Sequence, residues 1–208
     1  MTHIQKIDLL LSLYIASLVC AELLGGKVFT VWNVNASVAI FVYPLTFTIN
    51  DMITEVYGKA RARSFVRSGF IVLILLFAFT SLATMLPPAG RFAKVNPAYL
   101  TVFSQSQRII IASLVSFWLS EQFDVYVFAK LRQALGSYRL WLRANVSNVL
   151  GEFVDTTLFM FLAFYTPGAA AFIVSLVIPY WILKCIMSVV HTPVTYLGVR
   201  WLRLGGDA

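Results

Sequence analysis

Apolar residues run along this chain in six long stretches that are separated by short polar connections. A helix that crosses the hydrocarbon core of a bilayer needs about 20 mostly apolar residues. The pattern therefore predicts six membrane-spanning helices, at about residues 7–29, 36–57, 65–86, 108–129, 144–165 and 170–201. The sixth stretch is too long for an upright span, so we expect it to be tilted, or bent at Pro179 and Pro193.

Turn-forming residues mark the connections between these stretches. A short turn through Asn33 is expected between spans 1 and 2. The longest connection, residues 87–107, contains Pro87-Pro88, Gly90 and Asn96-Pro97. We expect it to be a loop on the opposite side of the membrane from the chain termini.

A polar stripe in span 5 is the first candidate for a functional site. Placed on a helix, Asn145, Asn148, Glu152 and Asp155 fall within about 80° of one another, while the rest of the helix is apolar. An ionised carboxylate facing lipid would cost about 2.5 kcal/mol or more. The stripe is therefore expected to face a protein interior, a partner group or water.

Two further spans carry acids whose interpretation stays open. Asp124 shares one face of span 4 with three serines, which could be helix-packing residues, and Glu121 lies at the border of that face. Span 2 contains Asn50, Asp51 and Glu55. Glu55 could be an interfacial partner of the lysine four residues on, whereas Asp51 lies one turn deeper and is the better site candidate.

Spans 6 and 1 each contain a lysine. Lys184 belongs to a third polar stripe, and it could either neutralise one of the acids in a packing ion pair or contact a ligand. His191, in the same stripe, is interpreted as a hydrogen-bonded core residue or a proton relay. Glu22 and Lys27 lie at the outer end of span 1, where snorkelling to the headgroups is the alternative to a role at a cavity mouth.

Composition agrees with a membrane protein. The 208 residues are 60% hydrophobic and 12% charged, with a mean hydropathy of +0.82. A soluble domain usually carries about twice that share of charge. We therefore predict an all-α integral membrane protein in which residues 1–208 form a single transmembrane domain with no soluble domain.

The net charge of +7 does not point to nucleic acid, because the basic residues lie in short clusters between the apolar stretches. With the N-terminus in the cytoplasm, eleven lysines and arginines lie on the cytoplasmic side and four on the other side. Since cytoplasmic loops are enriched in Lys and Arg, both termini are expected to be cytoplasmic. Seven of the nine acids lie inside or at the ends of spans and could converge on one cavity.

The sequence gives little support for a catalytic site or a metal site. The chain has two histidines and two cysteines, none of them at metal-ligand spacing, and no glycine-rich phosphate loop follows a strand. Cys20 and Cys185 lie inside apolar stretches and are interpreted as small core residues. We expect no enzyme activity, no metal and no cofactor.

Spans 2 and 4 end in similar segments. Residues 55–61, Glu-Val-Tyr-Gly-Lys-Ala-Arg, resemble residues 124–132, Asp-Val-Tyr-Val-Phe-Ala-Lys-Leu-Arg. The similarity fits an inverted repeat of three plus three spans, which is a common design of transporters with a midplane site.

Three segments resemble one known family. Residues 43–63 (Tyr-Pro-Leu-Thr-Phe-Thr-Ile-Asn-Asp-Met-Ile-Thr-Glu-Val-Tyr-Gly-Lys-Ala-Arg-Ala-Arg), 122–132 and 151–157 (Gly-Glu-Phe-Val-Asp-Thr-Thr) are similar to motifs of the queuosine precursor transporters, also called the vitamin uptake transporter family. Lys184, Pro193 and Tyr196 of span 6 match as well. The chain departs from the family pattern at Glu22, where an amide is expected, and at Glu152, where a glutamine is expected.

The resemblance implies a six-span importer of the bacterial inner membrane. Its implied substrates are 7-deazaguanines with a cyano or aminomethyl group at position 7, or queuine. A carboxylate can accept both adjacent donors of a guanine edge, a role for Asp155 or Asp124. Asn148 and Gln122 would satisfy the remaining polar groups, and Trp181 or Tyr180 would stack on the ring.

The mechanism expected from this resemblance is a carrier with a purine-like ligand near the midplane of the lipid bilayer. Facilitated diffusion and proton coupling through Glu152 and Asp155 both remain open. A rival hypothesis is a substrate-binding subunit that needs a separate energising ATPase module. A structural membrane protein is the third hypothesis, and whether the chain forms a homodimer is also open.

Overall fold

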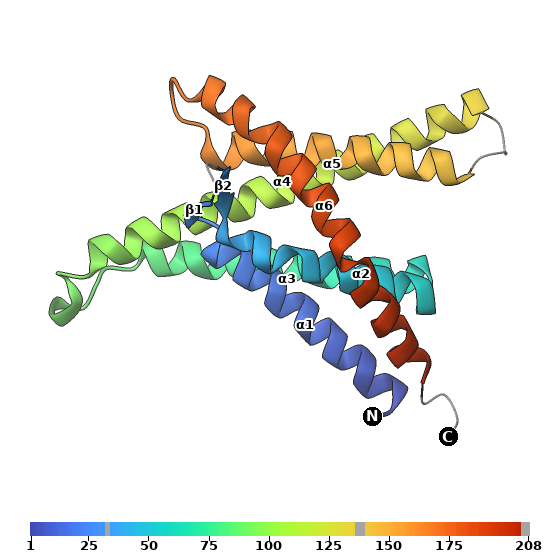
Figure 1. Cartoon of the computed structure of the whole chain (residues 1–208). Coiled ribbons are helices and arrows are strands. Elements are labelled where there is room, and N and C mark those ends of the chain that lie inside the picture. Colours follow the sequence, from blue (N-terminus) through green and yellow to red (C-terminus); the bar gives the residue numbers. More distant parts are fainter. Residues whose placement is uncertain (32–33, 136–139, 205–208) are drawn as a thin grey trace. The chain divides into compact units, whose positions relative to one another are not determined.

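The computed structural model describes residues 1–31, 34–135 and 140–204, with some side chains within these ranges left out of the description. The described chain is almost entirely helical (Figure 1). Its elements are, in order, α1 (His3–Leu24), β1 (Val28–Val31), β2 (Val34–Ser37), a 3₁₀ turn (Val38–Phe41), α2 (Tyr43–Tyr57), α3 (Lys59–Met85), a second 3₁₀ turn (Gly90–Phe92), α4 (Asn96–Leu135), α5 (Leu140–Phe164) and α6 (Ala170–Arg203).

Two of the described helical segments are long and apolar enough to cross a bilayer: His3–Leu24 and Ala60–Met85. A third, Ala170–Ile186, is apolar but shorter within the described residues. The expectation of a predominantly α-helical protein is confirmed, with two described helices long and apolar enough to span a membrane. The six-span bundle and the three-plus-three repeat stay predictions.

Helix α1 begins with a capping box. The Thr2 hydroxyl accepts a hydrogen bond from the Gln5 backbone N–H at 3.3 Å, and the Gln5 side chain accepts one from the Thr2 N–H at 3.0 Å. These two bonds satisfy backbone donors that have no partner within the helix. The helix therefore starts at His3, four residues before the predicted boundary.

A β-hairpin replaces the predicted ends of spans 1 and 2, and this part of the prediction was wrong. β1 and β2 pair antiparallel, with Val28 opposite Ser37 and Val31 opposite Val34. β-branched residues, which favour strands, outweighed the apolar pattern there. Because α2 starts only at Tyr43, it has 15 residues and is about 22 Å long, shorter than a full span.

The junction between α2 and α3 is a single glycine. Gly58 has a φ of 81°, a left-handed conformation that glycine adopts without the penalty of a Cβ. Helix α3 then begins at Lys59, six residues before the predicted start of span 3. The basic residues after Gly58 are therefore helical and do not form a loop.

Much of the predicted connection 87–107 is helical. Its second half, from Asn96 onwards, forms the first turns of the 40-residue helix α4. Proline is well tolerated in the first turn of a helix, where its missing N–H would lack a partner in any case. Asn96-Pro97 therefore marks the start of a helix, and its interpretation as a loop turn was wrong.

The chain divides into two compact units, which are described separately. Unit 1 comprises Met1–Gln107 and Leu183–Ala208, and unit 2 comprises Arg108–Ile182. The core of unit 1 lies among α1, α2 and α3, where the Tyr14 and Phe65 rings meet edge to face at 5.9 Å. Among its described residues, unit 2 has one apolar cluster around Ile109, Ala112 and Ala163 and another around Met160, Ile173 and Val177.

Three chain segments meet at one end of unit 1. The His3 ring lies 3.2 Å from the Tyr57 hydroxyl, the Lys6 ammonium donates to the carbonyls of Trp201 and Leu204, and Arg203 pairs with Glu55. We call this the basic end of unit 1, because it also carries exposed arginines: Arg61, Arg63, Arg200 and Arg203.

The opposite end of unit 1 is held by amides and hydroxyls. Gln105 donates to the Gly26 carbonyl at 3.1 Å, and Gln107 donates to the Thr84 hydroxyl at 2.9 Å. A Cβ on Gly26 would lie 3.0 Å from the Gln105 side chain, so the glycine permits this close approach.

Candidate functional site

Helix α5 carries the central polar residues of unit 2. Glu152 and Asp155 are half-buried, and each has an interaction partner; that this face avoids lipid stays a prediction. The next residue, Thr156, is 0% exposed. The side chains of Asn145 and Asn148 lie outside the described residues.

Thr156 differs from its neighbour Thr157 in its hydrogen bonding. The Thr157 hydroxyl donates to the Phe153 carbonyl one turn earlier, at 2.8 Å, which is the usual arrangement for threonine in a helix. The buried Thr156 hydroxyl has no hydrogen-bond partner among the described residues. A buried hydroxyl without a partner costs about 1–3 kcal/mol, so it is a candidate ligand contact.

A second donor of unit 2 comes from α6. The indole of Trp181 packs edge to face on Phe153 of α5, with ring centroids 5.5 Å apart and planes at 80°. Its Nε1–H is buried, again without a hydrogen-bond acceptor among the described residues. Trp181 thus combines an aromatic surface with an unsatisfied donor, the pair of properties suited to a flat heteroaromatic ligand.

The span 6 lysine lies in unit 1 and contacts an aromatic ring. The ammonium of Lys184 is 5.9 Å from the centroid of the Tyr43 ring, at the outer limit of a cation–π interaction. Tyr43 also packs edge to face on Phe47, at 5.4 Å. Both Lys184 and Tyr43 have additional interactions, and the predicted pairing of Lys184 with an acid stays a prediction.

The span 2 candidates lie on different sides of α2. Asp51 is exposed, whereas Asn50 is half-buried and its side-chain oxygen is buried without a donor among the described residues. Thr46, one turn earlier, is buried and donates to the Tyr43 carbonyl at 2.6 Å. Asn50 therefore has more of the character of a ligand contact than the sequence indicated.

Glu55 and Glu22 have distinct environments. Glu55 pairs with Arg203 at 3.2 Å, and the two side chains are 64% and 61% exposed, so the pair contributes little to stability. Glu22 is 1% exposed and has an interaction partner, so it does not snorkel to the headgroups. Lys27, in contrast, is exposed just before the hairpin.

The remaining predicted residues lie mainly on α4. Gln122 is exposed. The side chains of Glu121, Asp124, Asn148 and His191 lie outside the described residues. The candidates fall in both units, with Asp51 and Lys184 in unit 1 and Glu152 and Asp155 in unit 2. Their convergence on one cavity stays a prediction.

The sequence analysis did not identify two of these candidate contact residues, Thr156 and Tyr43. Thr156 lies four residues after Glu152 and hence on the same helix face, so the spacing could have identified it. Tyr43 opens the span 2 motif, but its contact with Lys184 joins residues far apart in the sequence. No local pattern indicates that contact.

Among the described residues, no group of three or more His, Cys, Asp or Glu could hold a metal ion.

Three relatives carry names that describe a transporter. A Bacillus subtilis (strain 168) protein named "Probable queuosine precursor transporter" is 29% identical over 185 residues, 88% of this chain and 80% of that protein. The "Queuosine precursor transporter" of Escherichia coli (strain K12) is 32% identical over 126 residues, 60% of this chain and 53% of that protein. A "Probable queuosine precursor transporter" of Haemophilus influenzae is 28% identical, over 59% of this chain and 49% of that protein.

The matches to the last two relatives span about half of their length. No solved structure matches the chain. The model of one protein family matches residues 37–198, which include α2 to α5 and most of α6. On this match, the chain belongs to the family described as "Putative vitamin uptake transporter".

Proposed function

We propose that this protein imports queuosine precursors across the bacterial inner membrane. Its cargo would be 7-cyano- or 7-aminomethyl-7-deazaguanine, or queuine. The observation that carries the proposal is the family match over residues 37–198, together with three relatives named for this cargo. The half-buried carboxylates of α5 supply chemistry that suits a guanine-type base.

The proposed architecture has six spans, an inverted three-plus-three repeat and both termini in the cytoplasm. The basic end of unit 1 supports the orientation, because the start of α1, the α2–α3 junction and the end of α6 meet there. Lys and Arg concentrate on the cytoplasmic side of membrane proteins. The same three segments would lie on one side of the bilayer in the six-span topology.

Base recognition is proposed to centre on α5. A guanine edge presents N1–H and an exocyclic amino group as adjacent donors, which the Asp155 carboxylate can accept together. Glu152 would balance the charge of an aminomethyl cation. The unsatisfied Thr156 hydroxyl and Trp181 N–H would donate to acceptors of the base. Asp124, Asn148 and Gln122 stay proposed contacts, as do Asp51 and Lys184 of unit 1.

Uptake by proteoliposomes that contain only this protein tests the proposal. Saturable uptake of labelled 7-aminomethyl- and 7-cyano-7-deazaguanine is expected. Binding without uptake would instead indicate a binding subunit that needs a separate energising module. Absence of both would contradict the proposed cargo.

Substitution of Asp155 by Asn tests the recognition mode. Loss of a charged hydrogen-bond acceptor is expected to weaken apparent affinity by about 10- to 100-fold. Asp8→Asn is the matched control, because Asp8 is exposed on α1 and the charge change is identical. Equal affinities of Asp155→Asn and the control would contradict the role given to Asp155.

The two carboxylates of α5 also allow a test of whether uptake is coupled to protons. Glu152 and Asp155 lie on adjacent turns of α5, and proton coupling through these two carboxylates is one of the two mechanisms that stay open. Proton-coupled uptake should respond to an imposed proton gradient in the wild type and lose that response in Glu152→Gln. Uptake that is independent of the gradient in both proteins would assign facilitated diffusion.

A further inference from the structure

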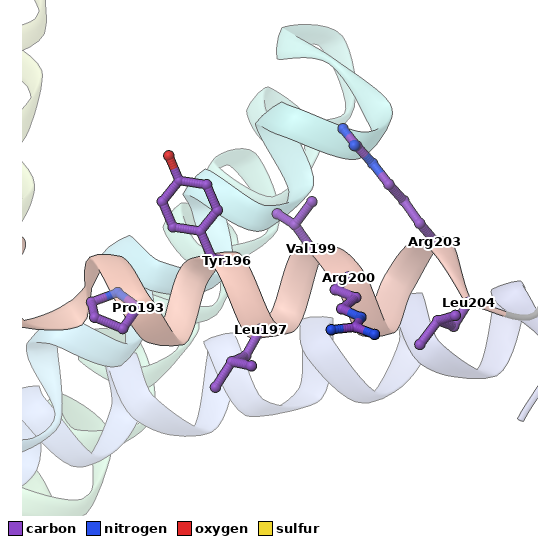
Figure 2. Close-up of a pocket in the computed structure, with 7 residues that line it drawn as sticks. All are labelled: Pro193, Tyr196, Leu197, Val199, Arg200, Arg203 and Leu204. Carbon is purple, nitrogen blue, oxygen red and sulfur yellow. The ribbon is translucent and has the colours of Figure 1, made fainter.

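A groove lies along the C-terminal part of α6, at the basic end of unit 1. Its volume is about 700 Å³, and its lining comes from residues 193–204 (Figure 2). Leu197, Arg200 and Leu204 project from the same side of the helix in this view. Their spacing of three and four residues keeps them on one helical face. One face of α6 therefore alternates apolar side chains with a cation.

The apolar part of the groove is open to its surroundings. Tyr196 is 73% exposed, Leu197 68% and Leu204 60%. In a membrane protein, such exposed apolar side chains at the end of a span contact acyl chains, and tyrosines gather at the headgroup level. This end of α6 therefore has the character of a lipid-facing surface.

The two arginines of the groove differ in their partners. Arg203 pairs with Glu55 at 3.2 Å. Arg200 is exposed, and its guanidinium has no hydrogen bond or ion pair with any residue that the structure describes. A guanidinium offers five N–H donors in a planar fork that matches a phosphate group. Arg200 is thus a free phosphate-binding group beside an apolar strip.

We propose that this groove binds an anionic phospholipid of the inner leaflet, with its phosphate on Arg200 and an acyl chain along Leu197. Charge favours an anionic ligand, because the lining of the groove includes two arginines, of which Arg203 pairs with Glu55, the one carboxylate paired with them among the described residues. A zwitterionic lipid would gain the apolar contact but would bring its own cation close to the arginines. The other arginines of the basic end, Arg61 and Arg63, increase the preference for anionic headgroups.

Native mass spectrometry of the full chain in detergent tests this site. Phosphatidylglycerol and phosphatidylcholine are titrated separately, and dissociation constants are read from the bound fractions. Arg200→Gln should weaken phosphatidylglycerol binding about fivefold, the effect of one cation near an anionic headgroup. Arg200→Lys should retain most of the affinity, and phosphatidylcholine binding should not change.

Two further variants separate this site from general charge effects. Arg91→Gln removes the same charge from an exposed position outside the basic end, and it should bind phosphatidylglycerol like the wild type. Glu55→Gln releases Arg203 and should tighten binding, a change of opposite sign. Equal losses in Arg200→Gln and Arg91→Gln, or no loss in either, would overturn the proposal. A dimer that Arg200→Gln abolishes would also overturn it, because the face would then bind a second copy.

Discussion

Lys6 lies on α1 and is 5% exposed, with its ammonium pointing at the C-terminal end of α6. It donates to the Trp201 carbonyl at 2.6 Å and to the Leu204 carbonyl, and it lies 5.0 Å from the centroid of the Trp201 ring. The last carbonyls of a helix have no partner within the helix, and they form the negative end of its dipole. Lys6 therefore caps α6 from a different part of the sequence.

Replacement of Lys6 by Met should destabilise unit 1. The variant keeps the apolar stem and loses the charged hydrogen bonds to α6, which is expected to cost about 1.5–3 kcal/mol. Unfolding by denaturant in micelles measures the stability, and amide hydrogen exchange should speed up at the last turn of α6. Lys94→Met, at an exposed position, is the control and should have little effect. Unchanged exchange in α6 would contradict the capping role.

Residue-level prediction from the sequence is limited to local signals. The spacing of Glu152 and Asp155 placed both on a half-buried face of α5, because a helical period fixes which positions share a face. The cap formed by Lys6 was out of reach, since its partners are 195 and 198 residues away in the sequence. Contacts of that kind depend on the tertiary arrangement.

At the scale of elements, α1 and α3 pack closely through a small residue. A Cβ added to Gly69 of α3 would lie 2.6 Å from the Leu18 Cδ1 and 3.1 Å from the Tyr14 Cε1, both on α1. Small residues at such contacts let two helices approach each other in a membrane, where dispersion contacts replace the hydrophobic effect. Gly69 thus sets the distance between two helices that, within the described part of the chain, are long and apolar enough to span the bilayer.

Gly69→Ala is expected to lower stability by about 1–3 kcal/mol, because the added methyl group overpacks the α1–α3 contact. Gly90→Ala is a matched control, since no atom lies within 4 Å of the Cβ position there. The midpoint of thermal unfolding in micelles reports the difference. A Gly69→Ala protein as stable as the control would show that α1 and α3 can separate without cost.

The apolar stretches predicted the presence of helices more reliably than they predicted the residues at which the helices begin and end. Long stretches such as residues 65–86 correspond to helices because apolar length itself favours a helix in a membrane protein. The hairpin of β1 and β2 was not predicted, because valine and threonine count as apolar or neutral in a span yet favour strands. Likewise, Asn96-Pro97 indicates either a turn or a helix start, and only the structure distinguishes the two.

For the whole molecule, the contacts at the basic end of unit 1 bear on topology. The N-terminus, the Gly58 junction and the end of α6 meet there, whereas the turn at Gly90 follows the other end of α3. Because α3 is long and apolar enough to cross a bilayer, its two ends should lie on opposite sides.

Reporter fusions should therefore divide into two classes. Fusions after residues 58 and 204 should give the cytoplasmic signal, with fluorescence of green fluorescent protein and no alkaline phosphatase activity. A fusion after residue 90 should give the opposite pattern. Cytoplasmic signals from all three positions would contradict the proposed orientation of α3.

The order of the segments in unit 1 has a consequence for synthesis on the ribosome. Unit 1 combines the first half of the chain with residues from Leu183 onwards, so its α1–α3 core emerges long before α6 does. Until Trp201 and Leu204 have been translated, the Lys6 ammonium lacks its carbonyl partners. The α1–α3 core of unit 1 can thus pack before α6 is available to dock on it. A chain truncated before Trp201 would leave the Lys6 ammonium without its two carbonyl acceptors, a defect that distinguishes it from a chain that includes the end of α6.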